Sequence, residues 1–420
     1  MLKTSKFEEI LRAAVGPENL RAALVADAVA GAVPEFVAVP PDEKHLAAAL
    51  ALANEAGITV APRGGGTKVN WGNPPKQAEL ILSTAKLNRI VEHAWADLTV
   101  TVEAGCTLQS LQQMLAQHGQ RLAFDGLWPE RATIGGVLST NDSGALRLRF
   151  GALRDLIIGV TIALPNGTLA SSGGKVVKNV AGYDLPKLVT GALGTLGVIT
   201  RAVFRLHPLP GAARTFSFTA ENIRTMQDYI LAIQDSQLSH TSLQIRSAAG
   251  EPTAADILFE ATDAGLAAQE SQLRNILGHA GIEQSPVRVW DMRQELWNSP
   301  TNSTLLAKIS MLPADMAKTL ASLKTLGDSR GLNWKVVVQA TGLGMLRLES
   351  EATQLSLAVD QFRTELESRG GSLFVLHCSQ QLHSIDAWGN SGDGVALMRA
   401  VKHQLDPKNT LNPGRFAGGI

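Results

Sequence analysis

The chain has 420 residues, of which 45% are hydrophobic and 18% charged, so it can bury a sizeable core and is not intrinsically disordered. Lys plus Arg equals Asp plus Glu, at 38 each, which excludes a global field that attracts nucleic acid or an anionic membrane. Its two cysteines, Cys106 and Cys378, are too few for a disulfide framework and predict reduced, buried thiols. The start lacks an apolar core of signal-peptide length, and no apolar run reaches about 18 residues. We therefore expect a cytoplasmic protein without a membrane span of its own.

The first half of the chain predicts short strands with a few helices between them. Residues 1–34 are expected to be helical and amphipathic. Thr107 is a good N-cap for a helix expected at 108–118. Proline and glycine in 207–211 end this part, and we place a domain boundary there. Strands are expected at 35–40, 58–62, 79–82, 90–92, 98–102, 156–164 and 198–206, and helices at 42–56 and 108–118.

The second half alternates strands with longer helices, which is typical of a ferredoxin-like α+β layer. We find no internal sequence repeat. A last helix is expected at 395–405, before a proline- and glycine-bearing tail. Strands are expected at 215–219, 241–246, 257–261, 305–312, 334–340, 345–349 and 372–376, and helices at 221–235, 264–280, 314–326 and 353–369.

Three glycine-bearing stretches are the most informative part of the sequence. They are Pro62-Arg-Gly-Gly-Gly-Thr67, the stretch 133–144 that starts Thr-Ile-Gly-Gly, and the stretch 181–200. Glycine lets a ligand come close to the main chain, so three such places suggest one long ligand held from several sides. Neither the P-loop pattern nor the Rossmann pattern G-x-G-x-x-G is present.

The first two glycine stretches can each act as an anion-binding loop. Successive amide groups in a glycine turn after a strand converge on an anion, and Arg63 and Thr67 add a charged and a hydroxyl donor. The stretch from Thr133 has the same kind of glycine pair, and Ser139 and Thr140 add further hydroxyls. A tight turn without a ligand explains either stretch taken alone. Together they favour a dinucleotide such as FAD.

In this order the motifs resemble the FAD-binding domain of the vanillyl-alcohol oxidase and p-cresol methylhydroxylase (PCMH) superfamily. The resemblance covers residues 35–210 and 400–420. The tail Leu405-Asp-Pro with Leu411-Asn-Pro-Gly-Arg415 is similar to the closing motif of the superfamily's 2-hydroxy-acid dehydrogenase branch. Within that branch, 175–187 and Trp388-Gly most resemble the FAD-binding subunits of glycolate oxidases (glycolate dehydrogenases).

The resemblance implies an α+β fold, with a PCMH-type FAD-binding domain of two α+β subdomains and a ferredoxin-like α+β cap domain. The domain boundaries that we expect are an N-terminal helical segment at 1–34, the FAD-binding domain at 35–210 and the cap at 211–390. Residues 391–420 would form a helix and a tail that return to the FAD-binding domain.

The resemblance also implies the cofactor-binding residues. The first glycine stretch would wrap the pyrophosphate, the second would line its other side, and Val198 and Ile199 would meet the adenine and ribose. Asn412 would lie near the flavin ring. Members that attach FAD covalently often carry a histidine where this chain has Thr67, so we expect non-covalent FAD. The full set is Arg63, Gly64, Gly65, Gly66, Thr67, Lys68, Pro129, Thr133, Ile134, Gly135, Gly136, Ser139, Val198, Ile199 and Asn412.

The chain departs from its catalytic relatives at the metal site. It has no run of the type G-H-x-G-D-G-N-x-H, and His377, Cys378 and His383 match no usual zinc spacing, so we expect no metal. The catalytic residues stay unassigned. Arg415, Lys178 and Tyr183 lie in motifs expected near the ring, but structural roles are the favoured interpretation of each.

The expected function is that of an FAD-binding subunit of a glycolate oxidase complex, which takes part in oxidising glycolate, a small 2-hydroxy acid, to glyoxylate. Its implied partners are a catalytic flavoprotein subunit and an iron–sulfur subunit, and any membrane contact would be made through the complex. This chain has no group of cysteines that could bind an iron–sulfur cluster. Two alternatives remain, a self-sufficient FAD-dependent dehydrogenase of another hydroxy acid or alcohol and a flavin-free scaffold of the same fold.

Overall fold

The computed structural model describes residues 2–174, 182–278, 280–379, 382 and 385–420, and they form two compact units. The first unit consists of Met1–Ser143, Gly151–Leu209 and Ser391–Ile420. The second consists of Gly144–Phe150 and Pro210–Asn390. The first unit therefore contains both the start and the end of this chain. The α+β class expected from the sequence is confirmed.

A four-stranded mixed sheet forms one half of the first unit. Asp42 caps the second of its two helices by accepting a hydrogen bond from the His45 amide at 3.0 Å. Leu46, Leu50 and Ala53 lie on one face of that helix and pack onto the sheet. In sheet order the strands are β1 (Leu20–Ala22), β2 (Phe36–Ala38), β4 (Leu80–Ser83) and β3 (Val60–Arg63), and the helices are α1 (Leu2–Val15) and α2 (Glu43–Ala56).

A five-stranded antiparallel sheet forms the other half of the first unit. Its inward side chains, such as Val102, Ile162 and Phe204, alternate along their strands and are buried against the helices. In sheet order the strands are β5 (Ile90–Ala94), β6 (Thr99–Glu103), β10 (Val198–Arg205), β8 (Ile157–Ala163) and β9 (Leu169–Gly173). The other elements of this unit are α3 (Leu108–Ala116), α4 (Ile134–Thr140), α6 (Leu153–Leu156), α7 (Leu185–Val189), α13 (Val395–Leu405) and the pair β7 (Gln120–Arg121) and β11 (His207–Pro208).

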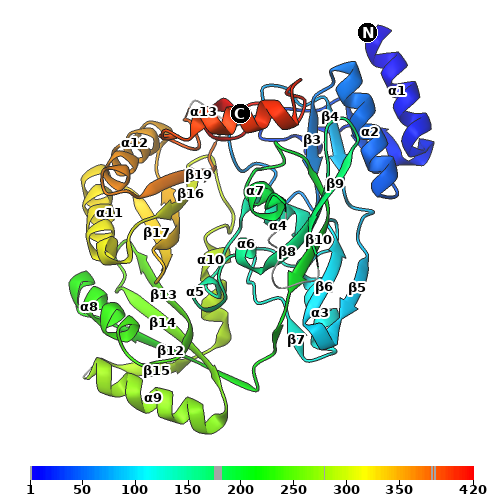
Figure 1. Ribbon diagram of the computed structural model, residues 1–420. Coiled ribbons are helices and arrows are strands. Elements are labelled where there is room, and N and C mark those ends of the chain that lie inside the picture. Colours follow the sequence, from blue (N-terminus) through cyan, green and yellow to red (C-terminus); the bar gives the residue numbers. More distant parts are fainter. Residues whose placement is uncertain (1, 175–181, 279, 380–381, 383–384) are drawn as a thin grey trace. The chain divides into compact units, whose positions relative to one another are not determined.

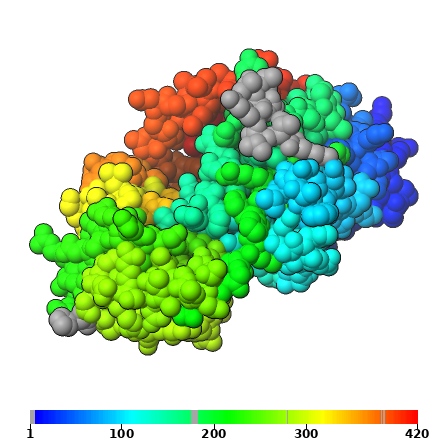
Figure 2. Space-filling model, turned by 60° about the horizontal axis from the view of Figure 1, so that its bottom comes forward, coloured from blue at the N-terminus to red at the C-terminus, as the bar shows by residue number. Residues whose placement is uncertain are grey.

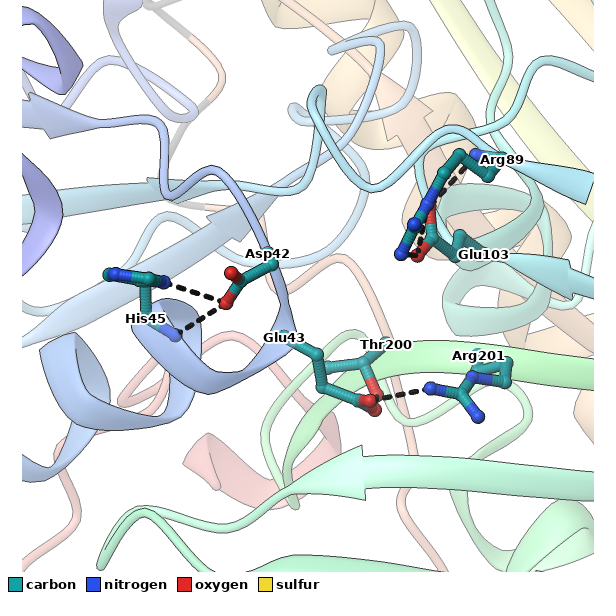
Figure 3. Close-up of polar contacts among 7 residues, drawn as sticks. All are labelled: Asp42, Glu43, His45, Arg89, Glu103, Thr200 and Arg201. Carbon is teal, nitrogen blue, oxygen red and sulfur yellow. Dashed lines mark hydrogen bonds and ion pairs between the residues drawn. The ribbon is translucent and has the colours of Figure 1, made fainter. Parts of the chain in front are cut away.

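Polar contacts anchor helix α2 to the five-stranded sheet of the first unit (Figure 3). Glu43, in the first turn of α2, accepts a hydrogen bond from the Thr200 hydroxyl and pairs with Arg201 at 2.7 Å, and both partners belong to β10. Arg89 and Glu103 pair at 2.7 Å nearby, between the start of β5 and the end of β6. Since β10 begins with Val198 and Ile199, these contacts fix a segment that was predicted to bind the cofactor.

The second unit is built on an eight-stranded antiparallel sheet in the order β15-β12-β14-β13-β17-β18-β16-β19. Each half of the sheet has the chain order βαββαβ and the ferredoxin-like strand order 4-1-3-2, and the halves meet where β13 pairs with β17. The first half contains β12 (Ala212–Thr219), α8 (Ile223–Gln234), β13 (His240–Ala248), β14 (Ala254–Ala261), α9 (Asp263–Leu277) and β15 (Ile282–Ser285). The second contains β16 (Thr304–Ser310), α11 (Met316–Arg330), β17 (Asn333–Gln339), β18 (Leu343–Glu349), α12 (Ala352–Ser368) and β19 (Ser372–His377).

The four long helices of the second unit cover one face of this sheet (Figure 1). Alternate strand residues, among them Phe216, Phe259 and Leu346, point to the helices and form the core. Helix α9 buries three leucines and leaves its other side to solvent, as its yellow-green atoms show in Figure 2. Two short helices, α5 (Arg147–Phe150) and α10 (Met292–Glu295), complete the unit.

The observed elements correct two expectations. The N-terminal helix ends at Val15 instead of running on to residue 34, because Gly16 at φ 90° and Pro17 break it and a strand follows. The stretch 134–140, expected as a glycine turn, is helix α4. The second unit also repeats one strand-and-helix pattern, although no sequence repeat marks it.

Replacing Glu43 with glutamine should lower the free energy of unfolding by about 1–2 kcal/mol, because a charged acceptor shared by Thr200 and Arg201 is lost. Urea unfolding at neutral pH measures this change. The matched control is Glu55→Gln on an exposed turn of the same helix, which should stay within about 0.5 kcal/mol of the wild type. Equal losses in the two variants would contradict a bond between α2 and β10.

Candidate functional site

A cleft in the first unit gathers the three glycine stretches and the C-terminal tail. The space bounded by its lining, about 710 Å³, includes a part that is open to solvent. The lining comes from the end of β3 and the loop after it, the first turns of α4, the segment before β10, and the tail. The lining residues are Pro62–Val69, Thr84, Thr133, Gly135, Gly136, Ser139, Thr140, Leu193, Gly194, Gly197–Ile199, Asn412 and Arg415.

The first glycine loop packs closely against the segment before α4. A Cβ atom on Gly64 would lie 2.0 Å from the Thr133 hydroxyl, and one on Gly65 would lie 1.8 Å from the Arg131 carbonyl oxygen. Side chains cannot approach so closely, so both positions require glycine. The glycines thus bring two backbone segments together at the floor of the cleft.

Two buried polar atoms in the cleft lack a hydrogen-bond partner within the described part of the chain. They are the Thr133 hydroxyl oxygen and the Asn412 side-chain oxygen. The Asn412 amide group donates to the Leu193 carbonyl at 2.7 Å, which aims its oxygen the other way. A buried polar atom without a partner costs about 1–3 kcal/mol, and a bound ligand can remove that cost. Together with the glycine cradle, these atoms fit a polar ligand such as the pyrophosphate and flavin groups of FAD.

An ion-pair network holds the loop that carries Arg63. The Asp27 carboxylate receives two bonds from Arg21, at 2.7 and 2.8 Å, and one from Arg63 at 2.9 Å. These bonds, first those from Arg21, hold the pKa of Asp27 well below its usual range. Arg63 therefore lines the cleft with its guanidinium already anchored to a carboxylate.

The C-terminal tail is held by a buried ion pair. Lys402 on α13 lies 2.6 Å from Asp406 and also donates to the carbonyls of Thr195 and Leu411 at 2.8 Å. Asp406 accepts from the amides of Thr410 and Leu411 at 3.0 and 2.8 Å. Burial lowers the pKa of Lys402, and the Asp406 carboxylate opposes that shift. The pair fixes the tail beside the segment that supplies Leu193 and Gly194.

The tail also extends the mixed sheet. Leu411 forms a parallel bridge with Val60, whose amide and carbonyl bond to Thr410 and Asn412 at 2.8 and 3.0 Å. Asn412 itself has φ 43°, a conformation that asparagine tolerates better than most residues. This bridge places Asn412 next to the strand that leads into the first glycine loop.

Two buried cations line the cleft. Arg415 donates to the carbonyls of Val69 and Trp71, and burial lowers its pKa to about 10. Lys68 lies 3.4 Å from the Asp142 carboxylate and is almost completely buried. Both groups can place positive charge beside an anionic cofactor.

A second cavity lies on the other side of Gly64 and Gly65. Asn88, Cys106 and Arg131 are among its lining residues, together with Thr107 and Ser110 at the start of α3. Burial raises the pKa of the Cys106 thiol to about 11, so this cysteine stays protonated at neutral pH.

Most of the residues predicted from the sequence line the cleft, and two do not. Ile134, the first residue of α4, is fully buried in the core, and Pro129 lies outside the lining, where its carbonyl accepts a bond from the Gln109 amide at 2.8 Å. Their assignment to the cofactor remains a prediction that this geometry does not favour. The thirteen that do line it are Arg63–Lys68, Thr133, Gly135, Gly136, Ser139, Val198, Ile199 and Asn412.

The weaker candidates for chemistry are scattered. Tyr183 is 90% exposed, and the Arg415 guanidinium binds backbone carbonyls. His377 lies at the end of β19 with its ring 6.3 Å from that of Trp297. Lys178 and His383 lie outside the described residues. Among the residues described, no group of three or more His, Cys, Asp or Glu side chains is placed to hold a metal ion.

Several residues that shape the cleft were missed by the sequence analysis. Asp27 lies 36 positions from Arg63, and Lys402 lies 207 positions from Thr195, so no local motif marks either contact. Thr84 and Leu193 line the cleft directly. Leu193 has φ 51°, and its place inside the third glycine stretch was the one available signal.

Comparisons with known proteins agree with this geometry. The family described as FAD binding domain matches residues 34–173, and the family described as FAD linked oxidases, C-terminal domain, matches residues 387–416. The chain is an FAD-linked oxidoreductase. Its FAD-binding domain has the PCMH-type fold, since the structure of p-cresol methylhydroxylase superposes with a TM-score of 0.82 at 17% identity, covering 98% of this chain and 96% of that one.

Two curated relatives of this flavoprotein match over nearly their whole length. The glycolate oxidase subunit GlcD of Bacillus subtilis is 26% identical, covering 91% of this chain and 89% of the relative. The D-2-hydroxyglutarate dehydrogenase of Xanthomonas citri pv. viticola is also 26% identical, with the same shares covered. Equal identities to proteins with different substrates support the cofactor class more strongly than any one substrate.

No helix in the described ranges of this flavoprotein is long and apolar enough to cross a membrane.

Thr133→Val should have opposite effects on the free protein and on FAD binding. Removing the unpartnered hydroxyl should leave the FAD-free protein as stable or up to about 1 kcal/mol more stable, and should weaken FAD binding about tenfold. Flavin fluorescence titration and urea unfolding measure the two effects. Thr319→Val, which removes a similar buried and unpartnered hydroxyl in the second unit, is the control and should leave FAD affinity unchanged. Unchanged affinity in Thr133→Val would exclude a bond from this hydroxyl to the cofactor.

Asp27→Asn should destabilise the protein in a pH-dependent way. The pKa of Asp27 is lower in the folded protein than in the unfolded protein. Its ion pairs therefore stabilise the fold fully above the unfolded-state pKa of about 3.9, and this stabilisation is lost as the pH falls through the folded-state pKa. We expect a deficit of about 2 kcal/mol at pH 7 that narrows below about pH 4. Urea unfolding at several pH values tests this, with the exposed Asp97→Asn as control. A deficit that does not change with pH would contradict the network.

Proposed function

We propose that this chain is the FAD-binding subunit of a glycolate oxidase complex, in which glycolate, a 2-hydroxy acid, is oxidised to glyoxylate and its electrons pass through flavin to a partner. The cleft is the observation that supports this proposal. The first glycine loop, the unpartnered oxygens of Thr133 and Asn412, and the C-terminal tail meet there, and all of them lie in regions matched by the two FAD families. The relative named as a glycolate oxidase subunit supports the substrate class and the role in a complex.

In this proposal the cleft binds FAD without a covalent link. The amides of the Gly64–Thr67 loop hold the pyrophosphate, and the Thr133 hydroxyl and Ser139 line its other side. Val198 and Ile199 hold the adenosine half through their backbone, and Asn412 lies toward the flavin. When bound, FAD supplies hydride and electron transfer, while the protein supplies binding, orientation and electrostatics. The domain boundaries that accompany the proposal are 1–34, 35–210, 211–390 and 391–420.

The proposed partners are a catalytic flavoprotein subunit and an iron–sulfur subunit. The sequence lacks the histidine-rich metal run of the catalytic relatives and has only two cysteines, so substrate turnover and iron–sulfur transfer are assigned to other chains. The complex is placed in the cytoplasm, with any membrane association made through a partner.

A self-sufficient dehydrogenase of another 2-hydroxy acid is the second candidate. The D-2-hydroxyglutarate dehydrogenase relative favours it, with the same identity over the same share of the chain. A flavin-free scaffold is less well supported, because it leaves the Thr133 and Asn412 oxygens unpartnered with no compensating ligand.

In the test, the purified chain is reconstituted with FAD. It is then mixed, in the absence of oxygen, with glycolate, D-lactate or D-2-hydroxyglutarate. We expect a yellow protein whose flavin absorbance bleaches at least a hundredfold more slowly than turnover of the complete complex, and whose return to the complex restores glycolate oxidation. Rapid bleaching by one acid in the isolated chain would overturn the subunit role in favour of the dehydrogenase. Failure to retain FAD would leave only the scaffold.

A further inference from the structure

Lys68 places a buried positive charge at the wall of the cleft. It follows the first glycine loop directly, lines the cleft, and has a side chain that is only 3% exposed. Its ammonium group lies 3.4 Å from a carboxylate oxygen of Asp142 and donates to the Leu127 carbonyl at 3.3 Å. The ring centres of Trp128 and Trp71 lie 5.2 and 5.7 Å from the same nitrogen.

The groups around Lys68 are ones that attract a cation. The faces of indole rings attract cations, and a carboxylate and a carbonyl oxygen supply further negative charge. Asp142 is held in turn, since its two oxygens accept bonds from the amides of Leu127 and Ser143, both at 2.9 Å. The charge of Lys68 and the opposite charge of Asp142 therefore have fixed positions beside the cleft.

Fixed charges near a flavin act on its two redox states differently. Reduction adds two electrons, and where a single proton follows, the reduced ring carries one more negative charge than the oxidised ring. A positive charge nearby then favours the reduced state, and a negative charge disfavours it. Such effects extend over several ångströms in a buried site, so the ammonium group need not touch the ring.

We propose that Lys68 raises the reduction potential of the bound FAD and that Asp142 limits this effect. The proposal rests on FAD occupying the cleft but is independent of the substrate and of the partners. Lys68 acts here through its electric field on the cofactor, so it is not a catalytic residue.

Two other roles for Lys68 make different predictions. A lysine that binds the pyrophosphate meets the same charge in oxidised and reduced FAD, so its removal weakens both states equally and leaves the potential unchanged. A lysine that only braces the loop affects stability when either partner of the ion pair is removed, again without a change in the potential. The direction of the shift in potential separates these roles from the one proposed.

The experiment measures the two-electron midpoint potential of bound FAD by equilibration with a reference dye, along with FAD affinity, in Lys68→Met and Asp142→Asn. We expect Lys68→Met to lower the potential by about 30 mV or more, which equals a tenfold loss of preference for reduced FAD. Asp142→Asn should raise it. The matched control is Lys76→Met, which removes an exposed lysine of the same unit and should leave the potential unchanged.

Shifts of opposite sign in the two variants support the proposal. Equal potentials in the wild type and both variants, or shifts of the same sign, overturn it. If Lys68→Met does not fold, Asp142→Asn decides alone, because its potential must still rise. A wild-type chain that does not bind FAD overturns the site assignment as well, and this outcome is recognised before any variant is compared.

Discussion

Gly64 and Gly65 pack against Thr133 and Arg131 at distances that leave no room for a Cβ atom. This contact joins the end of β3 to the start of α4, so the two sheets of the first unit meet where the cleft lies. Glu43 and the tail around Leu411 reinforce the same meeting point from other directions. The fold of the first unit is thus organised to bring backbone amides together from separate segments.

Buried or partly buried ion pairs surround this contact and fix its neighbours. Asp27 holds Arg63, Asp142 holds Lys68, and Asp406 holds Lys402, which in turn positions the Thr195 and Leu411 carbonyls. Taking charges out of water is costly, so such pairs are weak evidence of stability alone. Because these pairs surround one cleft, they can favour ligand binding, since a site that is already formed loses less conformational freedom when its ligand binds.

The sequence predicted those features that depend on local chemistry. Thr107 marked the start of α3, and the glycine loops marked most of the cleft. Features that depend on distant partners could not be read in the same way. Asp27 meets Arg63 across 36 positions of sequence. The repeated βαββαβ pattern is a matter of topology, and no sequence repeat marks it. Helix α4 was missed because two glycines in its first turn suggested a loop. Its first two amides, those of Ile134 and Gly135, donate to the carbonyls of Cys106 and Ala104 at 2.9 and 2.8 Å, and this distant segment could not be anticipated from local sequence.

The cleft is completed by a segment that lies 219 positions of sequence beyond Leu193. Asn412 and Arg415 line it, and the strand-like bridge at Leu411 forms only when this segment returns to Val60. A chain clipped before Leu411 would therefore present an open half-site that lacks Asn412 and Arg415, and free flavin would be held poorly there.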